Sequence, residues 1–175
     1  MNVSELKHGD LVLVNNKNSG ILFNLFLNMI RWGTHSDYTH VAIIVENPTF
    51  AEKPLQGIYV WQSTYEGLPD PQDGKIKLGV QLTALNDFLD HYKDVNIFVR
   101  RFSDICLFTD DRLKEAHTIA YDKPYDVYPK DWIEAFKQKD PNPQKTDRFW
   151  CSAFVGFVLT KIGILQSDTD WSIMR

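Results

Sequence analysis

The chain has 175 residues, a formal net charge of −4, and 43% hydrophobic and 13% aromatic side chains. This composition is typical of one globular domain over residues 1–175 and excludes an intrinsically disordered chain. The mildly acidic balance gives no electrostatic reason to expect a nucleic-acid partner.

Targeting and redox signals are sparse. Cys106 and Cys151 are too few for a disulfide framework, and the N-terminal sequence MNVSELKHGD lacks the regions of a signal peptide. We therefore expect a cytoplasmic protein. The most apolar run, residues 21–30, is far shorter than the roughly 20 residues that span a bilayer. No transmembrane segment is expected, and peripheral contact with a membrane is left open.

In chain order, strands come before most of the helices. The hydrophobic pattern predicts a strand at 10–14, a helix at 21–32, strands at 39–45, 57–63 and 79–82, a helix at 85–92, and a strand at 95–102. Helices follow at 110–121 and 131–137, and the last lies within 148–165. This segregation predicts an α+β fold with a mostly antiparallel sheet.

The segment RFWCSAFVGFVLTKIGIL, residues 148–165, carries the clearest helix signal. Its apolar residues recur at helical spacing from Cys151, Gly163 suits the C-terminal end, and Thr146 and Asp147 suit the start. Cys151 then falls in the first turn, where the helix dipole favours a thiolate. It is a candidate nucleophile, and the alternative is a small buried apolar residue.

A cysteine nucleophile needs a base, and the chain offers His8, His35, His40, His91 and His117. His117 lies on an apolar helix face, which is typical of a core histidine, and His91 lies on a surface-facing helix. His40 differs because it opens an apolar strand that we expect in the centre of the sheet. It is therefore the candidate base.

Pairing that strand with the next one gives His40 a partner. If Val45 lies opposite Gly57 in an antiparallel hairpin, His40 lies opposite Gln62 on the same face. The Gln carbonyl can accept a hydrogen bond from one ring N–H, which fixes the tautomer and leaves the other nitrogen for the thiol. A slip of one residue would turn Gln62 away. The alternative is two polar residues at a wet sheet edge.

Other site chemistries lack support. The sequence contains no zinc-binding motif, no phosphate-binding Gly-rich loop and no G-x-S-x-G elbow, so no cofactor or metal is expected. Cys106, in the segment ICLF, is expected in the core.

Three segments together resemble a known family. GDLVLV, THVAIIVE and FWCSAFVGFVL are similar to segments of the circularly permuted NlpC-type papain-like cysteine peptidases, the YiiX-like group with poxviral and large-DNA-virus relatives. In the unpermuted enzymes the Cys helix precedes the His strand, whereas here His40 precedes Cys151. The resemblance covers nearly the whole chain in element order.

The resemblance implies a papain-like fold in which Cys151 is the nucleophile and His40 the base of a thiol-dependent hydrolase. Many permuted relatives place a Glu where this chain has Gln62, and a neutral amide can also orient the imidazole. Glu66 is the alternative acidic partner. The segment KPYD resembles the family's Tyr motif, which makes Tyr125 a candidate for the oxyanion region, with ordinary loop packing as the alternative.

Three functions follow from these residues. The first is a peptidase or amidase that cleaves an amide or ester bond of a small peptide, amide or lipid ester through a thioester. The second is a lipid-directed acyltransferase or thiol esterase, and the third is a catalytically inactive binding module on the same fold. The sequence leaves the substrate and the oligomeric state open.

Overall fold

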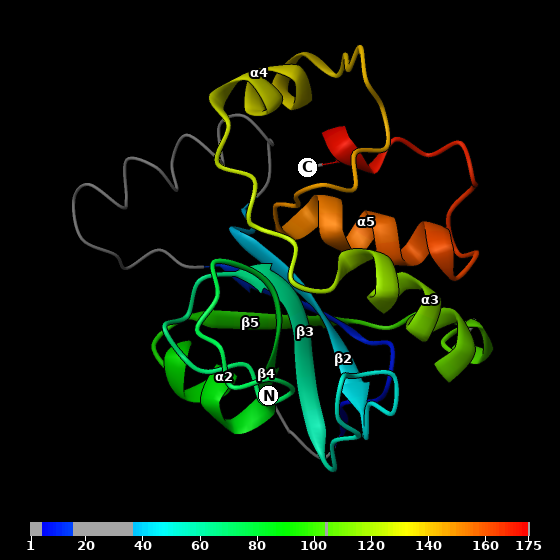
Figure 1. Cartoon of the computed structure of the whole chain (residues 1–175). Helices are drawn as coiled ribbons and strands as arrows, with labels where there is room; N and C mark the ends of the chain where they lie inside the picture. The colour runs from blue at the N-terminus through cyan, green and yellow to red at the C-terminus, as the bar shows by residue number, and fades with distance from the viewer. Residues whose placement is uncertain (1–4, 16–36, 104, 175) are drawn as a thin grey trace.

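A computed structural model describes residues 5–15, 37–103 and 105–174 (Figure 1). The helix predicted at 21–32 lies outside the described residues. Within them, none of the helices combines the length and the apolar character that crossing a bilayer requires.

Five strands form one sheet. They are β1 (Leu11–Asn15), β2 (His40–Glu46), β3 (Ile58–Thr64), β4 (Gly79–Ala84) and β5 (Asn96–Arg100), in the spatial order β4-β3-β2-β1-β5. Every neighbouring pair is antiparallel. The predicted α+β class with an antiparallel sheet is therefore confirmed, and β2 is the central strand, as its apolar residues on both faces predicted.

Helices cover the two faces of the sheet separately (Figure 1). Helices α3 (Asp110–Ala120) and α5 (Cys151–Lys161) build one core with the face that includes Ile43 and Trp61. Helix α2 (Leu85–His91) closes a second core on the opposite face, with Ala42, Ile44 and Phe88. The other elements of the described residues are η2 (Ile105–Leu107), α4 (Pro129–Lys137) and η3 (Trp171–Ile173).

Helix α5 begins at the candidate nucleophile. Cys151 is its first residue, and Trp150 is the N-cap but makes no side-chain capping bond. The predicted start at Thr146 and Asp147 is wrong, because Phe149 is held in a strand-like bridge to Tyr125 immediately before the helix. At the other end, Gly163 adopts a φ of 87°, the left-handed conformation expected of a residue that ends a helix.

The β2–β3 register differs from the predicted one by two residues. Val45 pairs with Tyr59 and not with Gly57. The reason is the loop, in which Asn47 and Gly57 bond to each other through N–H···O distances of 2.7 and 2.8 Å and both adopt positive φ angles. Because the offset is even, His40 and Gln62 still lie on the same face.

The prediction that Cys106 lies in the core is wrong. Cys106 is exposed in η2, a short surface turn between β5 and α3. Of the segment ICLF, Ile105 is 46% exposed and Phe108 is buried. A turn of three residues cannot direct all of its apolar side chains to one side. The apolar composition of the segment therefore predicted more burial than the structure has.

Candidate active site

Helix α5 packs against β2 and β3, and its first turn lies beside the first residues of β2. The backbone N–H groups of Val41, of Ser152 and of Cys151 itself lie near the Cys151 thiol and act to lower its pKa. Val41 directly follows His40 in the chain. The structure thus brings the two residues that the sequence proposed as nucleophile and base to the same end of the sheet.

His40 and Gln62 are in direct contact. The ring Nε2 of His40 lies 2.7 Å from Gln62 Oε1, and both side chains are buried. This contact is the one that the sequence predicted, although it is made diagonally across the β2–β3 pair and not between directly opposed residues. The hydrogen bond replaces the water that the imidazole loses on burial.

The tautomer of His40 follows from this contact. Gln62 Oε1 can only accept a hydrogen bond, so His40 Nε2 must carry the proton. In the neutral ring Nδ1 is then an acceptor, and it is the nitrogen available to take a proton from a thiol.

Glu66 does not contact His40 directly. Its carboxylate accepts hydrogen bonds from Gln62 Nε2 at 2.8 Å and from the Thr83 hydroxyl at 2.8 Å. The direct partner of the imidazole is therefore Gln62, and Glu66 stands behind it.

Tyr92 is a site residue that the sequence reasoning missed. Its ring stacks on His40, with centroids 6.1 Å apart and planes 14° from parallel. Burial raises the pKa of Tyr92, and the charges of Glu66 and Cys151 raise it further. The Tyr92 ring thus contacts His40 and lies near enough to Cys151 and Glu66 for their charges to raise its pKa. Tyr92 directly follows α2 in the sequence, and an aromatic residue at such a position predicts only that it packs in a core.

Tyr125 is held next to the start of α5 by backbone pairing on two sides. Its N–H bonds to Leu78 O at 3.0 Å, and Phe149 N bonds to Pro124 O at 3.0 Å. Burial raises the pKa of Tyr125 well above its usual value, and the charge of Cys151 is the next cause. Tyr125 therefore lies near Cys151, and its role in the oxyanion region stays a prediction.

Burial also controls the two candidate catalytic groups. The pKa of His40 falls to about 4, because burial outweighs the hydrogen bond that Nε2 donates to Gln62 and the charge of His91 lowers it further. Burial raises the pKa of the Cys151 thiol above its ordinary value, against the effect of the surrounding N–H groups. The N–H groups at the start of α5 act in the direction that favours a thiolate, but desolvation opposes them and is the larger effect on the pKa.

No cluster of three or more His, Cys, Asp or Glu side chains suited to a metal ion occurs within residues 5–15, 37–103 and 105–174. Comparison with protein-family models gives no match, and comparison with curated proteins gives none either.

Proposed function

We propose that the protein is a cysteine hydrolase on a permuted papain-like fold, which cleaves an amide or ester bond of a small peptide, amide or lipid ester. The observation that carries the proposal is the 2.7 Å contact between His40 Nε2 and Gln62 Oε1. It leaves His40 Nδ1 unprotonated at the end of the sheet where the Cys151 helix begins. A buried imidazole that is oriented in this way suits a general base.

In the proposed reaction, Cys151 Sγ bonds to the carbonyl carbon of the substrate while its proton moves to His40 Nδ1. The negative charge goes to the carbonyl oxygen, which the Cys151 N–H and the Tyr125 hydroxyl stabilise. Collapse expels the amine or alcohol, which takes the proton from His40 and leaves a thioester. Water activated by His40 then hydrolyses the thioester, and another acceptor in its place would make the protein an acyltransferase.

The pKa shifts favour proton transfer during the attack over a preformed ion pair. A lowered pKa for His40 and a raised one for Cys151 both favour the neutral forms at pH 7. A neutral thiol attacks poorly, so its proton must leave as the bond to carbon forms. Cys151 as a residue is partly exposed at the start of α5, and the proposed attack requires that a substrate carbonyl reach its thiol there.

Alkylation by iodoacetamide at pH 6 tests the base and the nucleophile together. Cys106 is exposed and serves as a reference thiol within the same molecule. We expect Cys151 to react about tenfold faster than Cys106 because His40 removes its proton, and we expect the advantage to disappear in His40→Ala. Mass spectrometry of peptides that carry each cysteine gives both rates.

Acylation by p-nitrophenyl acetate supplies a carbonyl probe. The hydrolase is expected to release one equivalent of nitrophenol in a burst and to carry the acetyl group on Cys151, with no burst in Cys151→Ser. If Cys151 reacts no faster than Cys106 and no burst appears, the fold carries a binding function and the hydrolase is lost.

A further inference from the structure

A carboxylate lies one hydrogen bond beyond the His40–Gln62 pair. Gln62 Nε2 donates to Glu66 Oε1 at 2.8 Å and to Thr83 Oγ1 at 3.0 Å. Thr83 in turn donates its hydroxyl proton to Glu66 Oε2 at 2.8 Å. His40, Gln62, Thr83 and Glu66 thus form one connected network in which three side chains are buried and Glu66 is partly exposed.

This network permits only one orientation of the Gln62 amide. A carboxylate accepts hydrogen bonds and cannot donate. Thr83 donates its single hydroxyl proton to Glu66, so it can only accept a hydrogen bond from Gln62. Both groups at the outer side of the Gln62 amide are therefore acceptors, and the atom between them must be the NH₂ nitrogen. The amide oxygen is left to face His40.

The orientation matters because the two ends of an amide have the same shape. If the Gln62 amide turned by half a revolution, its NH₂ group would face His40 Nε2, which would have to accept a hydrogen bond. The proton of the neutral ring would then move to Nδ1, the nitrogen that must receive the thiol proton. Gln62 is fully buried, so water cannot satisfy the amide in either orientation.

We propose that Glu66, with Thr83, is a positioning residue that fixes the Gln62 amide in the one orientation that keeps Nδ1 of His40 unprotonated. In this arrangement a neutral amide holds the imidazole, and the carboxylate behind it sets the direction of the amide. The consequence for catalysis rests on the proposed function, whereas the tautomer of His40 can be measured without any substrate.

The test is the tautomer of His40 in Glu66→Ala, read at pH 7 from long-range ¹H–¹⁵N correlations of the imidazole. Wild type is expected to hold the proton on Nε2. In Glu66→Ala, the Thr83 proton is released and can be donated to the Gln62 oxygen, so the amide can turn. We expect the ratio of Nε2–H to Nδ1–H to fall by about tenfold, the effect of losing one buried hydrogen-bond preference.

Two further variants sharpen the result. Glu66→Lys replaces the acceptor with a donor and is expected to favour Nδ1–H more than Glu66→Ala does. Glu115→Ala removes an exposed carboxylate on α3 and is the matched control, which should keep the wild-type tautomer. Because Glu66 is partly exposed, its replacement should leave the fold intact, which thermal unfolding checks.

Retention of Nε2–H in both Glu66 variants, or Nδ1–H in wild type, would overturn the positioning role. Alkylation of Cys151 at pH 6 separates this outcome from failure of the proposed function. If the tautomer shifts and alkylation slows with it, both stand. If the tautomer shifts while the alkylation rate of Cys151 stays the same, Glu66 positions the ring but His40 is not the base.

Discussion

Burial destabilises the protonated form of His40 by more than the hydrogen bond to Gln62 stabilises it. His40 is buried, with 9% of the residue exposed, and its pKa of about 4 means that the ring is neutral over most of the pH range in which a cell operates. A neutral imidazole with a free Nδ1 is the form that can accept a proton. Burial therefore disfavours the thiolate of Cys151 and at the same time keeps His40, its candidate base, in the neutral form.

The pH dependence of Cys151 alkylation follows from these two shifts. In wild type we expect a rate that rises through about pH 4, as His40 loses its proton, and then stays flat to about pH 7. In His40→Ala the thiolate is the only reactive form, so the rate should climb about tenfold per pH unit over that range. A wild-type rate that climbs as steeply as that of His40→Ala would rule out base assistance.

His40 should also make the stability of the fold depend on pH. Its pKa falls from 6.5 to about 4 on folding, so between these values the unfolded chain binds more protons than the folded one. The contribution of neutral His40 to the unfolding free energy is fully present above pH 6.5, and it is lost as the pH falls towards 4. We expect its contribution to the unfolding free energy to drop by about 2 kcal/mol from pH 7 to pH 5.

Urea unfolding at the two pH values measures this loss. His40→Gln should remove about 2 kcal/mol of the difference between pH 7 and pH 5, whatever its effect on absolute stability. His117, whose pKa burial also lowers, contributes in the same direction and is present in both proteins. Equal pH dependence in wild type and His40→Gln would show that His40 keeps an ordinary pKa.

At the scale of elements, the edge of β4 positions the Tyr125 segment. Gly79 has a φ of 151°, and a Cβ placed there would lie 2.2 Å from Lys123 O and 2.9 Å from Tyr125 N. Both are backbone atoms that cannot turn aside. We expect Gly79→Ala to cost at least about 2 kcal/mol in urea unfolding, since it adds overpacking to backbone strain.

Gly57→Ala is the control for that variant. Gly57 also has a positive φ, 108°, but among the described residues no atom beyond its two chain neighbours lies within 4 Å of the added Cβ. Strain alone should then cost about 1 kcal/mol. If the two alanine variants lose the same stability, the close contact of β4 with the 123–125 segment does not hold that segment in place.

The sequence predicted the elements and their faces better than their alignment. The alternation of side chains is enough to place His40 and Gln62 on one face of a sheet, and the helical spacing after Cys151 is enough to place it in a first turn. The register depends on the loop, where Asn47 adopts a φ of 44°, and no pattern in the strands reports this. Tyr92 was missed because its ring contacts His40 only once the chain has folded.

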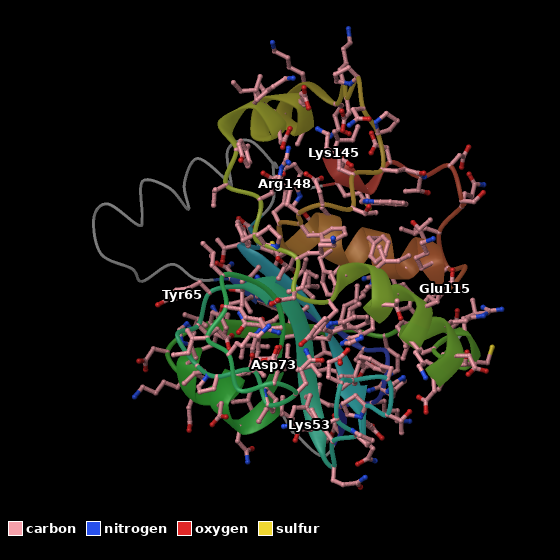
Figure 2. The ribbon with its side chains drawn as sticks, in the orientation of Figure 1. Lys53, Tyr65, Asp73, Glu115, Lys145 and Arg148 are labelled. Carbon is pink, nitrogen blue, oxygen red and sulfur yellow. The ribbon has the colours of Figure 1, made fainter. Side chains whose placement is uncertain are left out.

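The molecule as a whole is held together in two different ways. The sheet, α2, α3 and α5 enclose apolar cores. Helix α4 joins the first of these cores through Ala135, whereas Ile133 and Phe136 are exposed. Its described ion pairs link Asp131 and Glu134 to the segment before α5. Figure 2 shows Lys145 and Arg148 in the region between α4 and α5, and Arg148 NH2 and Lys145 Nζ both reach Asp131.

This division predicts that α4 can open without the core. Lys145 Nζ lies 2.9 Å from Asp131 and from Glu134 and 3.4 Å from Asp140, and its side chain is only 12% exposed. Lys145→Met would leave three acids facing one another without that cation. Arg148 would still pair with Asp131, but removing a cation from carboxylates with little access to water is costly. We therefore expect amide exchange in residues 129–137 to speed up about tenfold or more.

Hydrogen exchange with mass spectrometry tests this uneven stability. Amides of β2 and of the centre of α5 should keep their wild-type protection, because their exchange needs the apolar core to open. Lys161→Met is the matched control, since Lys161 reaches only Glu115, at 4.0 Å and at the surface, among its described acidic partners. Faster exchange of β2 together with α4 in Lys145→Met would mean that the charged network stabilises the whole fold, and that α4 is not a separate unit.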